Sequence, residues 1–223
     1  MIITIDGPAG TGKSTTARKV AEEMSYCLLD TGAMYRAITW GVIHYNIAHQ
    51  DPQALQKFLQ EHPLKLTSRF GERRYFLNSE DVSEHIRSPE VTALVSQISA
   101  YPIVREALVP IQRQSVQGMN AVCEGRDMGT TVFPKANLKI FLTANLDTRA
   151  QRRFSELKQN GKLSPTDTLE SIKVNINKRD EFDAAREHSP MKPAEDAILI
   201  DTSALTLQQV VDQIIILTEQ RSD

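Results

Sequence analysis

The chain has 223 residues, 40% hydrophobic and 24% charged, a length that suits one α/β domain with a modest additional lobe. Its formal net charge of −2 excludes a general attraction for nucleic acid or anionic membranes, so an anionic ligand must meet locally clustered Lys and Arg. Two cysteines are too few for a secreted disulfide scaffold, and no apolar run approaches the ~18 residues of a membrane span. Because Met1 also leads directly into an apolar run without a basic leader, we expect a cytoplasmic protein. The charge favours small-molecule partners, and as nothing suggests an obligate dimer, we expect a monomer.

Short apolar runs alternate along the chain with segments of helical periodicity. The apolar runs, each suited to a buried parallel strand, are 2–5, 27–29, 121–123, 138–142 and 197–200. The helical segments are 13–24, 32–45, 89–99, 103–116, 148–159, 168–182 and 207–219. This alternation predicts βαβ units and a parallel sheet.

Two stretches interrupt the alternation. Segments 65–67 and 74–77 flank Phe70-Gly71-Glu72 as the strands of a small hairpin would, which predicts a small-sheet insertion over about residues 60–88. The polar stretch of about residues 149–186 carries Gly161, Pro165 and many charges, and we expect it to form a mobile flap. Both are expected to be parts of a single domain of residues 1–223.

A phosphate-binding loop follows the first apolar run. Gly7-Pro8-Ala9-Gly10-Thr11-Gly12-Lys13-Ser14 satisfies the Walker A pattern, with a predicted strand before it and a predicted helix after it. Glycines let successive backbone N–H groups converge on a phosphate, and the helix N-terminus adds its dipole. Lys13 is expected to bridge the β- and γ-phosphates, and the Ser14 hydroxyl to ligate Mg²⁺. The alternative, a glycine-rich turn without function, requires a chance match expected in about a few per thousand chains. The predicted ATP site comprises Gly7, Pro8, Ala9, Gly10, Thr11, Gly12, Lys13, Ser14 and Thr15.

A guanine-nucleotide switch is the rival class of nucleotide-binding protein. Asn177-Lys178-Arg179-Asp180 matches the guanine-reading pattern, but it lies in a charged segment of helical periodicity rather than at the end of an apolar strand. The sequence contains no Asp-x-x-Gly, the usual γ-phosphate sensor of a switch. A kinase of small molecules is therefore favoured.

Three phrases point to one kinase family. They are Asp30-Thr31-Gly32-Ala33-Met34-Tyr35-Arg36, Glu124-Gly125-Arg126-Asp127-Met128-Gly129-Thr130 and Arg179-Asp180-Glu181-Phe182-Asp183-Ala184-Ala185-Arg186. They resemble bacterial cytidylate kinases, members of the nucleoside monophosphate kinase family. The resemblance implies a P-loop kinase fold: a five-stranded parallel sheet flanked by helices, an inserted monophosphate-binding lobe and a short lid. It also implies transfer of the ATP γ-phosphate to CMP or dCMP with Mg²⁺, in pyrimidine nucleotide metabolism.

The chain departs from the family pattern in two places. Glu124 stands where many members have Asp, which keeps the carboxylate but places it on a longer side chain. Phe182 and Ala184 replace arginines found in some lids, so phosphate binding by this lid depends on fewer charges. Another small-molecule P-loop kinase, acting on UMP or shikimate, and a nucleotide switch remain the alternatives.

The second pocket is expected at the carboxyl edge of the sheet, where open α/β sheets bind ligands. Arg36 lies one turn past Gly32 and can point back to that edge; its alternative is a solvated helix arginine. Thr31 is expected to cap the same helix and to contact the acceptor. Arg126 and Asp127 directly follow a predicted strand, with a surface ion pair as the alternative.

Other roles come from the resemblance or from helical spacing. The resemblance assigns Ser96 and Arg105 to the nucleobase, and without it Arg105 would be interpreted as solvated. Residues 149 and 153 share a helix face, and the resemblance places Arg149 on adenine and Arg153 at the donor phosphates.

Arg179, Asp183 and Arg186 recur at helical spacing, with an intrahelical salt-bridge ladder as the alternative, and the resemblance assigns Asp183 to the sugar. Asp127 is expected to select cytosine, because its carboxylate pairs with the exocyclic amine and opposes the uracil oxygen. Positioned positive charge is the expected basis of catalysis, supplied by Lys13, Arg126, Arg153 and Arg186.

Overall fold

The computed structural model describes residues 1–69 and 72–221, which form two compact units. The first unit consists of two chain segments, Met1–Leu29 and Gly118–Asp223, and the second is Asp30–Gln117. Phe70 and Gly71, at the centre of the predicted hairpin turn, lie outside the described residues.

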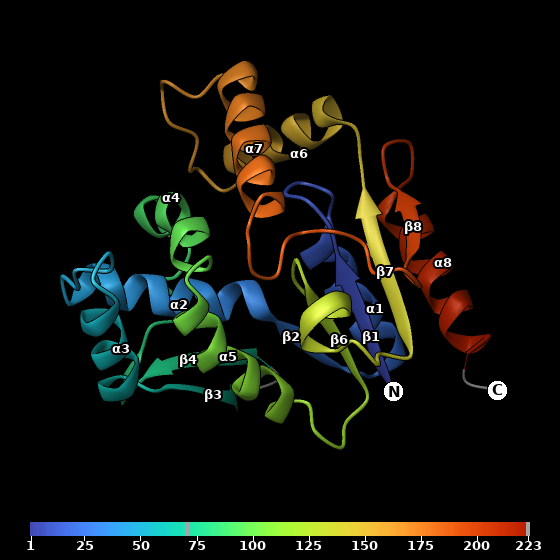
Figure 1. Ribbon diagram of the computed structural model, residues 1–223. Helices are drawn as coiled ribbons and strands as arrows, with labels where there is room; N and C mark the ends of the chain where they lie inside the picture. The colour runs from blue at the N-terminus through green and yellow to red at the C-terminus, as the bar shows by residue number, and fades with distance from the viewer. Residues whose placement is uncertain (70–71, 222–223) are drawn as a thin grey trace. The chain divides into compact units, whose positions relative to one another are not determined.

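The first unit is built on the predicted parallel sheet (Figure 1). Its strand order is β2-β6-β1-β7-β8, with β1 parallel to both β6 and β7, and β7 parallel to β8. Every strand overlaps a predicted apolar run, which confirms the expected alternation of strands and helices. The strands are β1 (Ile2–Asp6), β2 (Cys27–Asp30), β6 (Ala121–Glu124), β7 (Leu138–Thr143) and β8 (Ile198–Asp201).

The two faces of β1 have different neighbours. Ile3 and Ile5 are fully buried in a core that includes Val20 and Val211, so this face packs against α1 and α8. Side chains alternate along a strand, and Thr4 and Asp6 accordingly face η1, a short π-helix that the sequence did not predict. The flanking elements are α1 (Lys13–Met24), η1 (Met128–Val132) and α8 (Leu207–Glu219).

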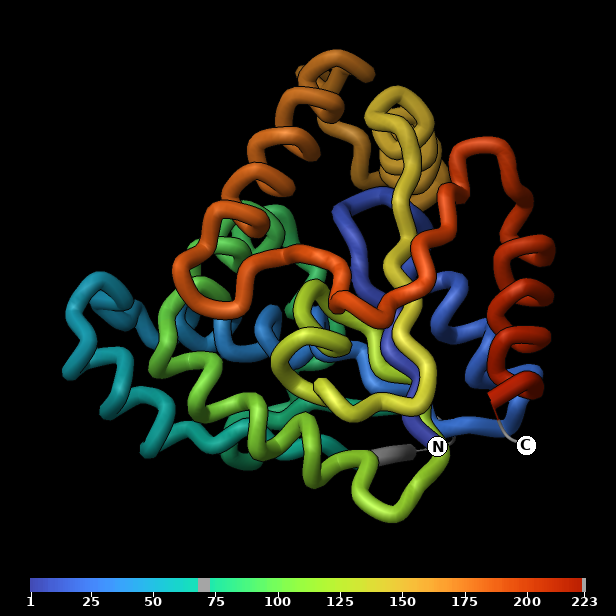
Figure 2. Tube along the Cα trace, turned by 45° about the vertical axis from the view of Figure 1, so that its right-hand side comes forward, coloured from blue at the N-terminus to red at the C-terminus, as the bar shows by residue number. Residues whose placement is uncertain are grey.

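The polar excursion of the sequence is mostly helical. It contains most of α6 (Leu146–Gln159) and all of α7 (Leu169–Ala184), which pack against each other through a small apolar cluster around Ala150, Ile172 and Ile176. Thr168 caps α7: its hydroxyl oxygen accepts from the Ser171 N–H. The Ser171 hydroxyl oxygen in turn accepts from the Thr168 N–H, which completes a capping box. From α7 the chain runs to β8, as the orange-to-red trace in Figure 2 shows.

The second unit combines helices with a small antiparallel sheet. Strands β3 and β4 pair from Leu64↔Leu77 onward, which confirms the predicted hairpin strands. Helix α3 was not predicted, although Asp51 caps it, Pro52 occupies its first position and Phe58 is buried. The elements are α2 (Thr31–His44), α3 (Pro52–Glu61), β3 (Leu64–Arg69), β4 (Glu72–Leu77), β5 (Glu80–Asp81), α4 (Pro89–Ile98) and α5 (Pro102–Gln114).

The cap of α2 differs from the prediction. Asp30, not Thr31, is the N-cap: its carboxylate accepts from the Ala33 N–H at 2.8 Å while its backbone remains extended at the end of β2. Thr31 is instead the first residue of the helix and is buried. Among the described residues, no helix combines the length and the apolar character needed to cross a membrane.

Candidate active site

The loop between β1 and α1 requires glycine for steric reasons. Gly7 has φ 138°, and a Cβ there would lie 2.1 Å from the backbone oxygen of Leu142 on β7. Gly10 has φ 78°, and a Cβ added there would lie 3.0 Å from the Cβ and the backbone oxygen of Arg149 on α6. No side chain of the described residues caps α1, whose N-cap is Gly12. The loop thus turns closely against the sheet, and the first N–H groups of α1 can bind an anion.

Lys13 is a buried cation at the start of α1. Its Nζ donates to the backbone oxygen of Pro8 at 2.6 Å, inside the loop. Burial, and next the positive charge of Arg126, lower the pKa of Lys13 to about 7, although Glu124 and Asp180 act in the opposite direction. A bound phosphate would supply the negative charge that this ammonium needs, and would raise its pKa.

Asp180 places a carboxylate on the loop. Its Oδ1 accepts from the Ala9 N–H at 3.0 Å, while Arg149 donates both to the Ala9 oxygen and to the Asp180 carboxylate. The sequence prediction for Arg149 placed it near the donor nucleotide, and it does lie at this loop. The prediction did not assign Asp180 any role, although it stands beside Arg179 in a phrase that carries the resemblance.

The Asp183 carboxylate is surrounded by arginines from two parts of the chain. It is 1% exposed and accepts from Arg126 Nε at 3.2 Å and from Arg186, while Arg179 Nε lies 4.0 Å away. The α7 spacing does produce an ion-pair ladder, but Arg126 joins it from the end of β6, so the cluster is more than a helix-surface ladder. Three guanidinium groups around one carboxylate leave a net positive charge for an anionic ligand.

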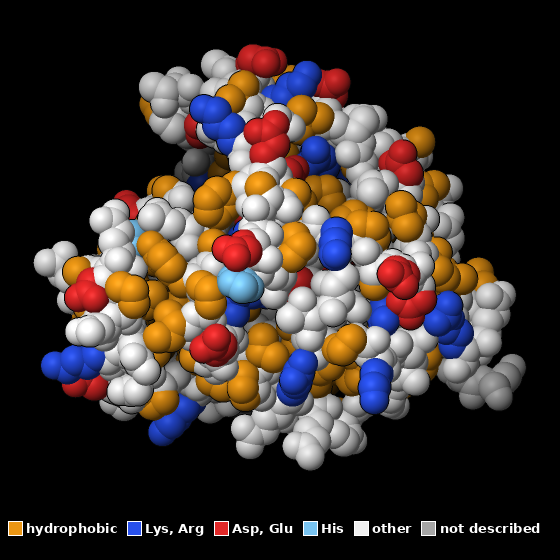
Figure 3. Space-filling model, in the orientation of Figure 1, with side chains coloured by type: hydrophobic (Ala, Val, Ile, Leu, Met, Phe, Trp, Pro, Cys, Tyr) orange, Lys and Arg blue, Asp and Glu red, His pale blue; other side chains and the backbone are white. Residues whose placement is uncertain are grey.

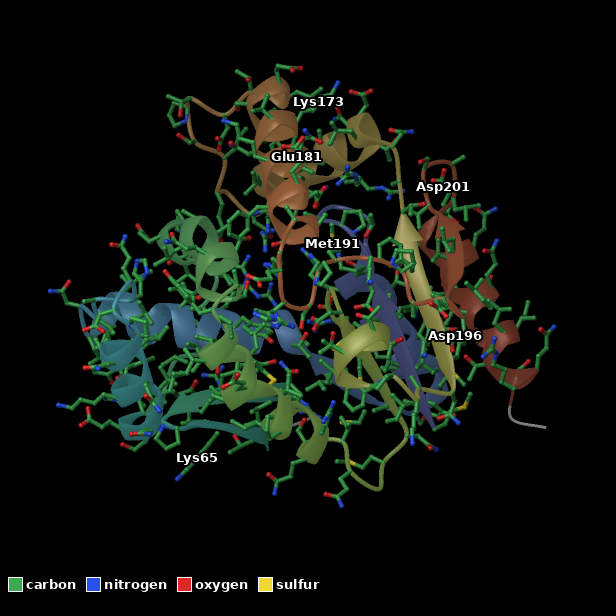
Figure 4. All side chains as sticks on the ribbon, in the orientation of Figure 1. Lys65, Lys173, Glu181, Met191, Asp196 and Asp201 are labelled. Carbon is green, nitrogen blue, oxygen red and sulfur yellow. The ribbon has the colours of Figure 1, made fainter. Side chains whose placement is uncertain are left out.

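The backbone also fixes the far end of α7. The Met191 N–H donates to the Asp183 backbone oxygen at 2.9 Å, and Asp196 accepts from Lys139 on β7 at 2.8 Å. Figure 4 labels Met191 and Asp196 on the segment after α7, and Glu181 on α7 itself. The segment after α7 is thus tied to the helix at Asp183, within the arginine cluster, and to the sheet at Asp196.

Asp127 is buried rather than part of a surface ion pair. It is 2% exposed and forms the N-cap of η1, where its backbone oxygen accepts from the N–H groups of Thr131 and Val132. Asp6, at the end of β1, binds the next two backbone N–H groups, those of Met128 and Gly129. The sequence prediction included Asp127 but missed Asp6; a carboxylate that ends a strand directly before a phosphate loop was the available signal.

Arg153 was predicted to meet the donor phosphates, and its neighbour Arg152 was left without a role. Arg153 pairs with Glu156 at 2.8 Å along α6, so this contact does not bring it to the loop. Arg152, its neighbour, donates to Thr202, whose hydroxyl in turn reaches the Thr11 oxygen.

Ser14 and Thr15 are exposed on the first turn of α1. An exposed Ser14 hydroxyl fits Mg²⁺, which keeps several waters and takes other ligands from phosphate. Among the described residues, no group of three or more His, Cys, Asp or Glu could hold a metal by itself.

The predicted acceptor residues Thr31, Arg36, Ser96 and Arg105 belong to the second unit. Arg36 donates to the Ile86 oxygen at 3.2 Å and to Thr92 Oγ1 at 2.9 Å. Arg105 is 5% exposed, donates to the Ser99 oxygen at 3.1 Å and lies 5.3 Å from the centre of the Tyr35 ring. Neither is a freely solvated arginine. Ser96 is half-buried on α4.

Comparison with known proteins gives a consistent family. The family model for cytidylate kinase matches residues 3–220. A cytidylate kinase of Protochlamydia amoebophila (strain UWE25) is 50% identical over 216 residues, covering 96% of this chain and 95% of the relative. A cytidylate kinase of Halalkalibacterium halodurans is 42% identical, covering 99% and 98%. This chain also matches 40% of the length of a bifunctional pantoate ligase/cytidylate kinase of Synechococcus sp. (strain JA-2-3B'a(2-13)), at 47% identity and over 98% of this chain.

Likeness to solved structures is weaker. A shikimate kinase of Bacteroides thetaiotaomicron aligns over 98% of both chains at 12% identity with a TM-score of 0.48. The assignment therefore depends on the family model and on the sequence relatives, which cover nearly the whole chain. The chain belongs to the cytidylate kinase family.

Proposed function

We propose that the chain transfers the γ-phosphate of ATP to CMP and dCMP, giving CDP and dCDP for pyrimidine nucleotide metabolism. The observation that supports this most directly is the combination, within one unit, of a phosphate loop carrying buried Lys13 and an arginine cluster around Asp183. Transfer between two anions needs cations at fixed positions, and both features supply them.

The chemistry needs positioning and charge rather than a covalent intermediate. An oxygen of the acceptor phosphate attacks the γ-phosphorus, the bond from that phosphorus to the β–γ bridging oxygen breaks, and ADP leaves with the electron pair. Lys13 stabilises charge that moves toward the bridging oxygen, while Arg126 and Arg186 neutralise the oxygens of the transferring group. Arg153 is proposed to act with them once its pair with Glu156 opens.

Mg²⁺ would be held by Ser14, through its hydroxyl, together with the nucleotide phosphates, and would supply further charge neutralisation. The residues of the chain supply the remainder: Gly7 to Thr15 bind the donor phosphates, and Arg149 is proposed to stack on adenine. The Ala9 N–H belongs to the phosphate loop and already donates to Asp180. A change in this loop on phosphate binding therefore affects the contact with Asp180.

That coupling supports a lid over about residues 149–186. Because α7 is joined to the loop through Asp180, we propose that α6 and α7 order further when both nucleotides bind. Amide hydrogen exchange across these residues, free and with an adenosine–cytidine bisubstrate analogue, is the test. Equal protection in the two states would contradict a closing lid.

Recognition of the acceptor is proposed residue by residue. Asp127 would accept from the cytosine amine, assisted by Ser96 and Arg105, while Arg36, Arg179 and Arg186 would bind the acceptor phosphate. Thr31 and Asp183 are proposed to contact the nucleoside. On the face seen in Figure 3, acidic and basic side chains are interspersed, which suits a small ligand better than a polyanion.

A coupled assay of ADP release tests the proposal. With ATP and Mg²⁺, CMP and dCMP should be better acceptors than UMP, AMP and shikimate. Asp127→Asn should lower turnover of CMP and narrow the CMP to UMP ratio of kcat/KM, since an amide presents either a donor or an acceptor. An unchanged ratio would remove Asp127 from base reading; preferred turnover of UMP or shikimate, or hydrolysis without any acceptor, would reject the assigned activity.

A further inference from the structure

Asp6 forms a two-point hydrogen-bonded clamp between β1 and η1. Its Oδ1 accepts from the Met128 N–H at 2.9 Å and its Oδ2 from the Gly129 N–H at 2.8 Å, across more than 120 residues of chain. The side chain is 4% exposed. Both carboxylate oxygens are therefore committed to two consecutive backbone amides at the start of η1.

The clamp lies between two parts of the proposed site. Asp6 directly precedes Gly7, the first residue of the phosphate loop, and the clamped amides directly follow Asp127. The Asp127 backbone oxygen is already bound by Thr131 and Val132, so the segment that carries this carboxylate is fixed on both sides. A displacement of η1 would move the Asp127 side chain with it.

Close packing makes the clamp sensitive to small changes. A Cβ on Gly129 would lie 3.1 Å from Thr4 Oγ1 and 3.2 Å from Lys139 Cδ, so η1 lies directly against β1 and β7. Tight packing of this kind transmits small displacements, so a change at the clamp should be felt at η1.

The charge of Asp6 also indicates that this residue does more than fill space between β1 and η1. Burial raises the pKa of Asp6 to about 6, and nearby Asp127 acts in the same direction, while the two amides and Lys13 lower it. Asn would fill the same volume without a buried charge, but its NH₂ group cannot accept a hydrogen bond. Only a carboxylate binds both amides.

We propose that Asp6 is a positioning residue that fixes Asp127 relative to the phosphate loop through its two hydrogen bonds to η1. The inference depends on the proposed base-reading role of Asp127. It gives nucleobase selection and the phosphate loop a common anchor on β1.

Asp6→Asn tests the clamp, because it preserves shape and removes one of the two acceptors. We expect the KM for CMP to rise and kcat/KM for CMP to fall about tenfold to a hundredfold, the effect of one lost charge-assisted hydrogen bond. The CMP to UMP ratio of kcat/KM should narrow, and the melting temperature should not fall in proportion.

Thr4→Val is the matched control. Thr4 faces the same side of β1 and packs on Gly129, yet among the described residues its hydroxyl has no hydrogen-bond partner. A valine there should leave kcat/KM and the CMP to UMP ratio within about twofold of the parent.

Asp127→Asn, measured in parallel, separates the two hypotheses. If Asp127→Asn changes the base ratio and Asp6→Asn does not, the clamp proposal is wrong while the proposed function stands. If Asp127→Asn leaves the base ratio unchanged, the base-reading role on which the clamp proposal depends is wrong, and the proposal falls with it. If Asp6→Asn and Thr4→Val both lower stability and lower kcat/KM for every acceptor equally, Asp6 is structural only, and the proposal is also overturned.

Discussion

Arg126 Nε donates to Asp183 Oδ2 across 3.2 Å, although 57 positions separate the two residues in the chain. The pair joins the end of β6 to the last turn of α7. Arg186 donates to the other oxygen of the same carboxylate, Oδ1. Two arginines from distant parts of the chain thus meet at a single buried carboxylate.

Asp183→Ala should therefore remove the carboxylate that the three surrounding arginines share. We expect kcat/KM for CMP to fall by at least about a hundredfold and the free energy of unfolding by about 1–3 kcal/mol, because a buried acceptor of charged donors is lost. Asp147→Ala is the control: it removes an exposed ion pair with Lys173 and should change the free energy of unfolding far less than Asp183→Ala does. Equal behaviour of the two variants in kinetics and urea unfolding would contradict the assigned importance of Asp183.

Lys13→Met should separate function from stability. Turnover should drop by about two to three orders of magnitude, since the charge acts on the breaking bond. The folded-state pKa of about 7 lies below the ordinary 10.5, so the native state holds this proton less tightly than the unfolded state. The stability cost of Lys13 is thus full below about pH 7 and fades as the pH rises toward 10.5.

The Lys13→Met variant should accordingly melt above the parent at pH 6–7, and the difference should shrink by pH 9.5. Saturating ATP should stabilise the parent more than the variant. Thermal unfolding at three pH values, with and without ATP, measures both effects. A difference that grows with pH would show that burial of the ammonium is not the cause.

Gly7→Ala should disrupt the phosphate loop sterically. The added methyl would meet the Leu142 oxygen at 2.1 Å, so β7 or the loop must shift. We expect a loss of more than about 2 kcal/mol in stability and at least about tenfold in ATP affinity. Gly118 also has positive φ, 74°, but no described atom lies within 4 Å of its added Cβ, so Gly118→Ala should cost only about 1–2 kcal/mol and leave ATP affinity unchanged. Similar ATP affinities in the two variants would rule out the clash with Leu142.

The pH dependence of stability reports on Asp6 directly. Its folded-state pKa of about 6 exceeds the ordinary 3.8, so the native state binds this proton more tightly and loses stability, relative to Asp6→Asn, as the pH rises from about 4 to about 6. The full change, from well below pH 4 to above pH 7, is about 3 kcal/mol at ~1.4 kcal/mol per pKa unit, and about 2 kcal/mol of it falls between pH 4.5 and 7.5. Urea unfolding of both proteins from pH 4.5 to 7.5 measures it, and a constant difference would refute the burial of an ionised Asp6.

Local sequence pattern was sufficient for most of the fold. Apolar runs and helical periodicity located all five strands of the large sheet and the Walker A loop, because these signals lie within a few consecutive residues. Helix α3 was missed, although Asp51-Pro52 is a start signal, since it is a short amphipathic segment in a polar region. The cap of α2 was assigned one residue late, because Asp30 and Thr31 are both good caps and only the backbone decides between them.

The site was harder to predict than the fold. Arg126, Asp127 and Asp183 were named from phrases, but their burial and mutual contacts come from tertiary structure. Asp6 and Asp180 bind backbone amides 122 and 171 positions away, respectively, and no periodicity encodes such pairs.

The first unit is assembled from two chain segments with the whole second unit between them. Pairing Ile2 with Ala121 closes a loop of more than a hundred residues, whereas the contacts of the second unit lie within one continuous stretch. On a ribosome, β1 and the phosphate loop emerge first yet must wait for β6 and β7 before they gain partners. We therefore expect the second unit to fold first during synthesis, and nucleotide binding to be acquired late.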